Sequence, residues 1–264
     1  FLQTHPEVEI FEVILHDLNG IHRGKWLPRE QIHKLFEGGY KMPQSTCSLD
    51  SWGRDLEELV TATGDTDGIC IAHPETLAIV PWAKRPTAQI VVSMLSPDGQ
   101  SDYPADPRVV LQQVIERYTK LGLTPVVASE MEFHLLEIDR DQFGRPQHTQ
   151  RAIDGSPALG GATYGIEAMR EIAPLMDAIS GAAKLQNLPV DTLISEFGAS
   201  QCEINLHHQN SALRACDQAS MLRRAIRAVA QQQGKQASFM AKPFAGEVGN
   251  GMHVHFSLLD SRGN

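Results

Sequence analysis

The chain has 264 residues, a formal net charge of −9 and a sequence pI of about 5.6. Hydrophobic residues make up 42% of it and charged residues 21%, the balance of a globular protein with a sizeable core. The length suits one large or two modest domains. The acidic balance argues against nucleic acid as a partner, because nucleic-acid binders usually carry a basic stripe.

Cysteine and hydropathy patterns exclude further classes. No two of the four cysteines form a Cys-x-x-Cys pair, so the chain contains neither a zinc ribbon nor a thioredoxin motif. We expect reduced thiols and a cytoplasmic location. No apolar run approaches the roughly 18 residues of a membrane span, and no signal peptide is visible. The start at Phe1 without a Met and the turn-like end at Asn264 suggest a portion of a longer protein.

The first part of the chain is expected to be mostly β. Residues 8–28 have the composition of a hairpin with Asn19-Gly20 as its turn. The cluster Ser96-Pro97-Asp98-Gly99 is typical of a boundary, so we predict domains over 1–99 and 100–264. The other elements expected before it are a short helix over 32–36, a loop over 38–68, and strands over 76–82 and 89–95.

The second part mixes helices and strands. Asp106-Pro107 is a helix start and Gly122 a helix stop. Pro174 is expected to kink a helix over 166–186. The other expected elements are strands over 125–137, 238–241 and 251–259, a long loop over 139–162, strand material over 190–208 interrupted near 197–200, and a helix over 212–233.

The strand expected over 125–137 alternates acidic and apolar residues. Because side chains on a strand point to opposite faces in turn, Glu130, Glu132 and His134 share one face. We expect the residues between them to pack into a core: Met131, Phe133 and Leu135. A Glu-x-Glu pair is often a solvated edge, but the apolar flanks of this strand argue against that. Neighbouring carboxylates repel unless a cation intervenes, so the pair predicts a divalent-metal site.

The strand expected over 251–259 repeats the alternation with imidazoles. His253, His255 and Ser257 share one face. The opposite face is expected to be core: Met252, Val254 and Phe256. A His-x-His strand also suits zinc. The preceding Gly249-Asn250-Gly251 lets backbone groups approach a ligand closely, although no Gly-Lys-Ser/Thr follows and it is not a Walker loop.

Glu196 and Glu203 flank a turn of small residues, which either brings both acids to one point or forms a plain surface bend. Beside the Glu130 segment they favour two neighbouring metal sites made by four acids and a histidine. The remaining histidines that we considered are expected at the surface or in packing: His16, His22, His73, His207 and His208.

Four motifs in order resemble those of the glutamine synthetase superfamily. They are Ser-Glu-Met-Glu-Phe (129–133), Ser-Glu-Phe-Gly-Ala-Ser-Gln-Cys-Glu-Ile (195–204), Phe-Met-Ala-Lys-Pro (239–243) and Gly-Asn-Gly-Met-His-Val-His-Phe-Ser-Leu (249–258). The stretch Asp17-Leu18-Asn19-Gly20 with Arg23-Gly24-Lys25 looks like the family's N-terminal domain. The resemblance covers nearly the whole chain, and the four motifs are jointly specific although each alone is weak.

The resemblance implies an α+β fold, with a small N-terminal β-grasp domain and a larger catalytic domain that this chain holds incompletely. It implies homo-oligomers of stacked hexameric rings with active sites between neighbouring subunits. It also implies a reaction: ATP, with Mg²⁺ or Mn²⁺, phosphorylates the γ-carboxylate of glutamate, and an amine then displaces phosphate. Phosphoryl transfer depends on cations that neutralise the oxygens, and the acids seen here would hold them.

The resemblance also implies roles at single positions. Glu132, Glu196 and Glu203 match ligands of the metal that supports glutamate and the acyl phosphate, and Glu130 and His253 match ligands of the metal that bridges the ATP phosphates. The remaining matches are a residue near the phosphates, one near the nucleotide, and the loop beside the amino-acid substrate: His255, Ser257, and Gly249 with Gly251.

Departures from the family pattern favour an amine larger than ammonia. Ala199-Ser200 stand where the family often has Pro-Gly, so we expect a different turn geometry. Ammonia-using members commonly carry Asn where Val248 stands. They also carry an Asp-Gly-Ser-Ser loop, whose counterpart here is Leu49-Asp50-Ser51-Trp52, and Asp50 matches the acid that helps bind ammonium. Such changes are more typical of members that join glutamate to polyamines.

Four functions stay open at this point. The favoured one is an ATP-dependent ligase that joins glutamate to a polyamine-type amine. The alternatives are a glutamine synthetase using ammonia, a non-catalytic ring scaffold that binds ligands, and a zinc hydrolase built on His-x-His. The retained acids argue against the scaffold, which has no reason to keep uncompensated negative charge. None of these functions involves nucleic acid or a membrane.

Overall fold

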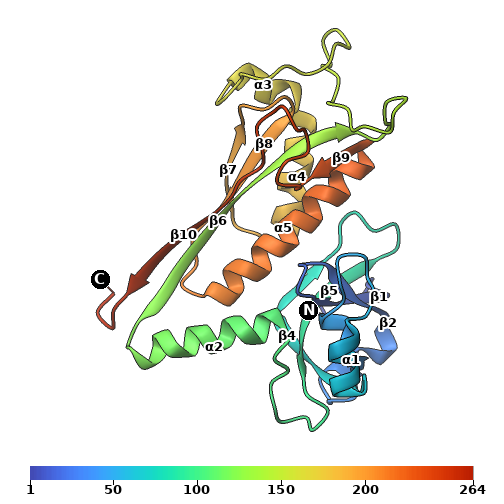
Figure 1. The fold of residues 1–264 in the computed structure, drawn as a ribbon, viewed down its shortest axis with the longest axis vertical. Helices are drawn as coiled ribbons and strands as arrows, with labels where there is room; N and C mark the ends of the chain where they lie inside the picture. The colour runs from blue at the N-terminus through green and yellow to red at the C-terminus, as the bar shows by residue number, and fades with distance from the viewer. Residues whose placement is uncertain (264) are drawn as a thin grey trace. The chain divides into compact units, whose positions relative to one another are not determined.

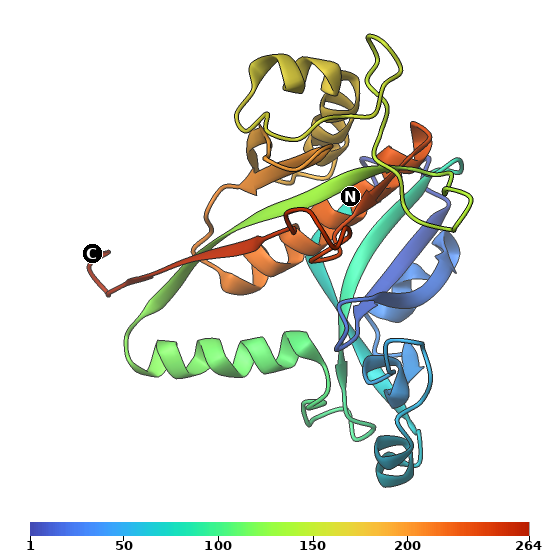
Figure 2. The same ribbon diagram turned by 45° about the horizontal axis from the view of Figure 1, so that its top comes forward.

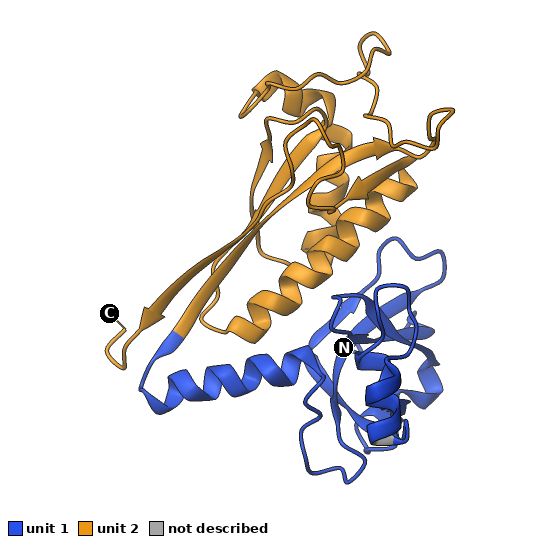
Figure 3. Ribbon diagram, viewed as in Figure 1, with its two compact units in different colours: residues 1–124 blue, residues 125–264 orange. Residues whose placement is uncertain are grey.

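The computed structural model describes residues 1–263 and divides the chain into two compact units, Phe1–Thr124 and Pro125–Asn264 (Figure 3). The helix that follows the boundary expected near residue 99 groups with the first unit. The domain boundary predicted between residues 99 and 100 stays a prediction. Over the described residues, every helix is too short or too polar to cross a bilayer.

The first unit is built on a five-stranded sheet in the order β2-β1-β5-β4-β3 (Figure 2). Its strands are β1 (Ile10–His16), β2 (His22–Pro28), β3 (Lys41–Pro43), β4 (Asp67–Ile79) and β5 (Thr87–Leu95). β1 runs parallel to β5 and antiparallel to β2, and β4 is antiparallel to both of its neighbours. This mixed sheet, with few helices, is the expected β-grasp arrangement.

The hairpin over 8–28 is confirmed, with β1 and β2 paired from Ile10↔Pro28 to His16↔His22. Its turn depends on Asp17, which is only 1% exposed. One carboxylate oxygen accepts from the backbone N–H groups of Asn19 and Ile21, and the other accepts from Arg23 Nε at 2.9 Å. The Asp-Leu-Asn-Gly motif is therefore a turn closed by a buried, fully bonded carboxylate.

The loop expected over 38–68 is wrong in part, because short elements interrupt it. These are β3, the 3-10 helix η2 (Gln44–Cys47) and the helix α1 (Glu57–Thr63). Met42 and Cys47 are buried in the hydrophobic core of this unit. Elements this short are held by tertiary packing, which local composition does not reveal. The short helix expected over 32–36 is the 3-10 helix η1 (Arg29–Leu35).

The helix α2 (Pro107–Lys120) begins and ends as the sequence predicts. The Asp106 side chain accepts a hydrogen bond from the backbone N–H of Arg108, and Pro107 lies in the first turn. Gly122, just beyond the helix, takes a φ of 71°.

The second unit holds a five-stranded sheet ordered β10-β6-β8-β7, with β9 also pairing β6 (Figure 1). Its strands are β6 (Thr124–Glu137), β7 (Val190–Ser195), β8 (Gln201–Leu206), β9 (Lys235–Ser238) and β10 (Met252–Leu259). Its helices are α3 (Ile166–Glu171), α4 (Ala173–Leu185) and α5 (Ala212–Gln232). The two longer helices pack against each other, and α5 lies along one face of β6.

Most of these elements confirm the predictions. The helix over 166–186 is two helices rather than one, because Pro174 lies in the first turn of α4 and a proline there starts a new helix. The loop over 139–162 contains only isolated bridges. β9 lies three residues earlier than expected, because it pairs with the end of β6 from Glu137↔Lys235 to His134↔Ser238.

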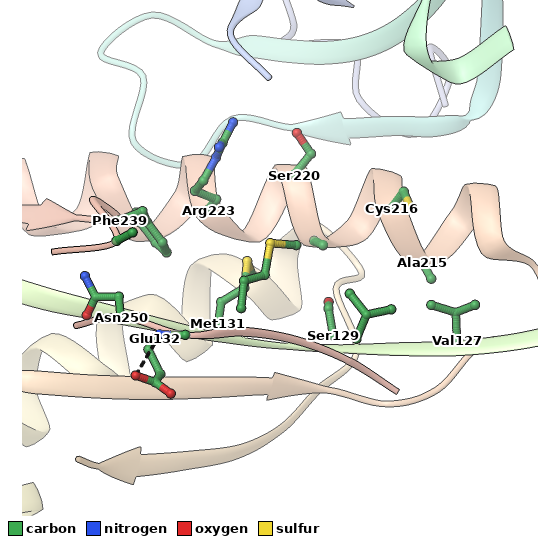
Figure 4. A pocket seen from close by; sticks show the side chains of 15 residues that line it. Val127, Ser129, Met131, Glu132, Ala215, Cys216, Ser220, Arg223, Phe239 and Asn250 are labelled. Atoms are coloured by element: carbon green, nitrogen blue, oxygen red, sulfur yellow. Dashed lines mark hydrogen bonds between the residues drawn. The ribbon is translucent and has the colours of Figure 1, made fainter. Parts of the chain in front are cut away.

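The two faces of β6 differ as predicted. Met131, Phe133 and Leu135 are at most 3% exposed. Met131 points toward α5 and Glu132 points to the other face (Figure 4), and the alternation of the strand puts Glu130 on the face of Glu132. The same prediction for β10 is wrong, since Met252, Val254 and Phe256 are 64%, 59% and 52% exposed. β10 is an edge strand, and a cavity of about 340 Å³ lies between its start and α5 in place of packed side chains (Figure 4).

One glycine of the N-terminal motif allows a stability prediction. Gly24 has a φ of 155°, and a Cβ at this position would lie 1.7 Å from the carbonyl oxygen of Val13 on β1. Gly24→Ala should therefore lower the free energy of unfolding by at least about 2 kcal/mol, measured by urea denaturation. Gly39→Ala is the matched control, because its Cβ would meet only ordinary contacts at 3.7 Å or more. Equal stability of the two variants would contradict the strand geometry.

Candidate active site

Three strands bring acidic and imidazole side chains to the sheet face opposite α5. In the antiparallel register of β6 and β8, Glu132 pairs with Glu203 and Glu130 with Asn205. Residues directly opposite in such a pair have Cβ atoms about 4.5–5.5 Å apart and share a face. β10 lies on the other side of β6, where Glu132 N donates to Gly251 O at 3.2 Å. The alternation predicted from the sequence therefore places both segments side by side.

Both histidines of the His-x-His pair converge on one carboxylate. His253 Nδ1 lies 3.2 Å from Glu130 Oε2, and His255 Nε2 lies 2.9 Å from Glu130 Oε1. In the absence of metal, the two imidazoles contact both oxygens of Glu130. A cation that binds there would compete with them for these oxygens. Both histidine side chains are more than half exposed, so they can turn toward solvent or toward a ligand.

Glu130, Glu203 and His253 form a group that fits a divalent cation. One ligand atom from each lies within 4.8 Å of the other two. Two carboxylate oxygens and one imidazole nitrogen are donors that manganese accepts readily, and carboxylates also suit magnesium. The three residues come from three neighbouring strands, so the sheet holds their backbone positions rigidly.

The electrostatics of Glu203 show that the acids crowd one another. Burial raises the pKa of Glu203 above its usual value, and the negative charges of Glu130, Glu196 and Glu132 raise it further, while a hydrogen bond with Asn205 opposes the shift. Glu203 is only 7% exposed. A cation beside this carboxylate would favour its charged form and reverse the direction of the shift.

Glu132 is held differently from the other acids. Its Oε2 accepts from Gln201 Nε2 at 2.7 Å and from the backbone N–H of Gly251 at 2.9 Å. A Cβ at Gly251 would lie 2.7 Å from Glu132 Oε1 and 3.1 Å from His253 Nε2. With glycine at position 251 these two groups face the same space, and a larger residue would displace them.

Glu196 precedes the turn that joins β7 to β8. Its backbone N–H donates to Gln201 O, and Gln201 N–H donates back to Gly198 O. Ser200 takes a φ of 58°, the left-handed conformation that glycine adopts without strain. The turn thus keeps a glycine-like backbone with serine in place, supported by a 2.7 Å hydrogen bond between the Ser200 and Thr149 hydroxyls. Glu196 lies outside the group of three atoms, but its charge is felt at Glu203.

A groove of about 890 Å³ begins beside Glu130 and runs along β6, β8 and β10. His255 and Ser257 line it, as do His207 and His208, which are exposed as expected. Gly249 precedes β10, and a Cβ there would lie 2.3 Å from Ala241 O, so this position also requires glycine. Glu130 lines the groove and also belongs to the group of Glu130, Glu203 and His253 that fits a cation.

Asp50 belongs to the first unit, where it closes a local turn. Its carboxylate accepts from the backbone N–H groups of Trp52 and Arg54 and from Arg54 Nε at 2.8 Å. The Arg54 N–H is the main reason that the pKa of Asp50 is lowered. Its role toward an amine stays a prediction.

Sequence reasoning missed the neutral residues that organise the acids. Gln201, only 3% exposed, bonds Glu132, and Asn250 Oδ1 accepts from His134 Nδ1 at 2.7 Å. The signal for Gln201 was the same alternation used elsewhere, since Gln201, Glu203 and Asn205 occupy every second position of β8.

Residues 104–264 match the family described as "Glutamine synthetase, catalytic domain". Gamma-glutamylputrescine synthetase PuuA of Escherichia coli (strain K12) is 34% identical over 267 residues, a match covering 100% of this chain and 56% of that protein. A glutamine synthetase of Pyrococcus horikoshii is 30% identical over 251 residues, covering 95% and 51%. A glutamate–isopropylamine ligase of a Pseudomonas species is 27% identical over 274 residues, covering 100% and 57%.

Solved structures share the fold. One named "GmaS/ADP complex-Conformation 1" superposes with a TM-score of 0.82 at 24% identity, covering 100% of this chain and 56% of that one. The chain spans about half the length of the curated relatives it matches. The family match covers more than half of the chain, and the PuuA alignment covers all of it. The chain therefore belongs to the glutamine synthetase family.

Proposed function

We propose that this protein uses ATP to phosphorylate the γ-carboxylate of glutamate and then joins the acyl group to an amine. The observation that carries the proposal is the convergence of Glu130, Glu203 and His253 to within 4.8 Å, with Glu132 fixed beside them. The pKa of Glu203 is raised by burial and by its acidic neighbours, so its charged form is costly unless a cation is bound. Named relatives that are glutamate–amine ligases and glutamine synthetases support the reaction class.

The reaction exchanges two bonds in turn. A γ-carboxylate oxygen attacks the γ-phosphorus of ATP and ADP leaves; the amine nitrogen then attacks the acyl carbon, phosphate leaves, and the nitrogen loses a proton. Mg²⁺ or Mn²⁺, when bound, would supply positive charge against the phosphoryl oxygens. Glu130, Glu132, Glu196, Glu203 and His253 would hold these ions. The register of β6 and β8 supports this proposal, because it sets the backbone positions of Glu130, Glu132 and Glu203.

The groove beside Glu130 is our proposed place for the ATP phosphates and nucleotide, with His255 and Ser257 in its wall. The N–H of an imidazole such as His255 can donate a hydrogen bond to a phosphate oxygen. The loop at Gly249 and Gly251 is the proposed place for the amino-acid substrate. A backbone carbonyl approaches Gly249 closely, and the Glu132 and His253 side chains approach Gly251, so neither position has room for a side chain.

We propose a polyamine-type amine in preference to ammonia. The relative PuuA is named a gamma-glutamylputrescine synthetase, and two others are named for isopropylamine and methylamine. Val248 stands where ammonia-using members commonly carry Asn, which is consistent with that preference. We also propose assembly into stacked hexameric rings and action in the cytoplasm, where ATP and glutamate are supplied. The acid Asp50 is the proposed contact to the amine across subunits.

The amine preference can be tested by ADP release in the intact protein with glutamate, ATP and Mn²⁺. We expect kcat/KM for putrescine to exceed that for ammonium by at least about tenfold, since each added methylene in an apolar pocket is worth roughly that factor. Ethanolamine serves as a short-chain comparison. Preference for ammonium would identify a glutamine synthetase, and zinc-dependent hydrolysis without nucleotide would identify a hydrolase.

The metal-holding role of Glu132 has its own test. Glu132→Ala should abolish ligation and leave assembly unchanged, because the side chain projects from a strand whose opposite face carries the packing. Activity assays and light scattering on the same preparation separate these effects. Near-normal turnover in this variant would exclude the proposed arrangement, and absence of metal-dependent ATP binding in the wild type by calorimetry would favour a scaffold.

The raised pKa of Glu203 predicts opposite effects on stability and on metal binding. A carboxyl with a higher pKa in the folded state contributes stability that is present below its unfolded pKa and lost as pH rises through its folded pKa. At neutral pH, Glu203→Gln should therefore raise the Tm of the metal-free protein, and the gain should shrink as pH falls. Mn²⁺ should raise the Tm of the wild type but not of this variant.

Glu137→Gln is the matched control for that experiment, since Glu137 lies on the same sheet with a pKa shifted the other way. Burial acts to raise the pKa of Glu137, but the Lys235 ammonium at 2.6 Å and the Gln150 N–H lower it overall. This variant should lose stability at neutral pH. A lower Tm for metal-free Glu203→Gln would contradict the crowding of charge at the site.

A further inference from the structure

We propose that Gln201 is a positioning residue that couples metal binding to amino-acid binding by joining the Glu132 carboxylate to the Gly249 carbonyl. The inference rests on the proposed function, in which Glu132 holds a metal and the loop over 249–251 borders the amino acid. Gln201 is uncharged and touches neither reactant in this proposal. It acts through the groups that it holds.

The contacts of Gln201 use its whole amide. Nε2 donates to Glu132 Oε2 at 2.7 Å and to Gly249 O at 2.8 Å, with Asn250 Oδ1 at 3.3 Å. Oε1 accepts from the backbone N–H of Gly198 at 2.9 Å. A carboxylate and a carbonyl can only accept hydrogen bonds, and a backbone N–H can only donate. These partners therefore fix the amide orientation, and the reverse orientation would place oxygen against oxygen.

The side chain joins segments that are far apart in the sequence. Glu132 is 69 residues and Gly249 is 48 residues from Gln201. The third partner, Gly198, lies in the turn that follows Glu196. Because Gln201 is 3% exposed, water cannot readily replace the hydrogen bonds if one of them breaks. A shift of the loop is thus felt directly at Glu132 and at the turn.

The loop itself is anchored so that it can transmit such a shift. Asn250 Nδ2 donates to Ser238 O at 3.1 Å and to Met240 O at 2.8 Å, which turns its Oδ1 toward His134 Nδ1. Gly251 N–H adds the second hydrogen bond to Glu132 Oε2. The loop therefore reaches the Glu132 carboxylate twice, once through its own backbone and once through Gln201.

The consequence for Glu132 is a fixed carboxylate plane. Two donors engage Oε2, while Oε1 faces the space left open at Gly251 and shared with His253 Nε2. With the Gln201 bond removed, Gly251 N–H alone would define the orientation, and the carboxylate could rotate about its terminal bond. Hydrogen bonds that orient metal-binding carboxylates affect metal affinity by about 10–100-fold when removed.

The test measures Mn²⁺ binding to the intact protein by electron paramagnetic resonance, with and without L-glutamate and without nucleotide. In the wild type, L-glutamate should tighten Mn²⁺ binding, and Mn²⁺ should tighten L-glutamate binding by the same factor. Gln201→Met, which keeps the length but removes the hydrogen bonds, should weaken Mn²⁺ binding by about 10–100-fold and abolish the effect of L-glutamate.

Gln218→Met is the matched control, because Gln218 is a buried amide on α5 in the same unit, 8% exposed. It should keep wild-type Mn²⁺ affinity and coupling. If Gln201→Met melts well below the wild type, Gln201→Asn replaces it, since the shorter amide keeps a polar group but cannot span both partners. Wild-type coupling in either folded Gln201 variant would overturn the proposal.

The readout separates this inference from the proposed reaction. Loss of coupling in Gln201→Met in a protein that ligates no amine would support the positioning role and overturn the ligase proposal. Ligation by the wild type with unchanged coupling in Gln201→Met would overturn the positioning role alone. In an active enzyme, the variant should lower kcat and raise the KM for glutamate, while the KM for the amine stays close to the wild-type value.

Discussion

Repulsion between like charges on one sheet face is the constraint on which this structure depends. The β6–β8 register sets Glu132 against Glu203, and β10 adds two imidazoles that both turn toward Glu130. Such a face is unfavourable in a metal-free protein, as the raised pKa of Glu203 indicates. The fold tolerates it because Glu130, Glu132, Glu203, His253 and His255 all lie on paired strands and because the opposite face of β6 is buried. The buried face of β6 contributes to the stability of the fold, and the proposed metal site lies on the opposite face.

Neutral polar groups complete the arrangement at this face. Gln201, Asn250 and the Gly251 N–H give hydrogen bonds to or around Glu132 without adding charge. A lysine in place of Gln201 or Asn250 would pair with the carboxylate and weaken its attraction for a cation. Amide donors instead fix the direction of the carboxylate while leaving its charge available. The glycines at 249 and 251 serve the same end by leaving room for close approach.

The sequence could predict what depends on short-range periodicity. Alternation along 125–137 identified both the buried and the acidic face of β6, and Asn19-Gly20, Asp106-Pro107 and Gly122 marked turns and helix ends correctly. What failed depends on distant contacts. The elements β3 and α1 are short and held by packing, and the apolar side of β10 is exposed because edge position and burial are properties of the sheet. Gln201 shares the alternation of β8 with Glu203, but its bonds to Glu132 and to the Gly249 carbonyl join segments 69 and 48 residues away, which the local pattern does not reveal.

Ser200 carries a consequence for the long loop that precedes α3. Its backbone stays in a glycine-like conformation while its carbonyl accepts from Leu135 N–H and its hydroxyl pairs with Thr149, 51 residues earlier. This hydrogen bond attaches the loop to the bend between Glu196 and β8, the strand that carries Glu203. A substitution in this loop can therefore change the geometry around Glu196 and Glu203, although the loop holds none of the proposed metal ligands. A change in the position of Thr149 would act on the bend through the hydrogen bond between the two hydroxyls.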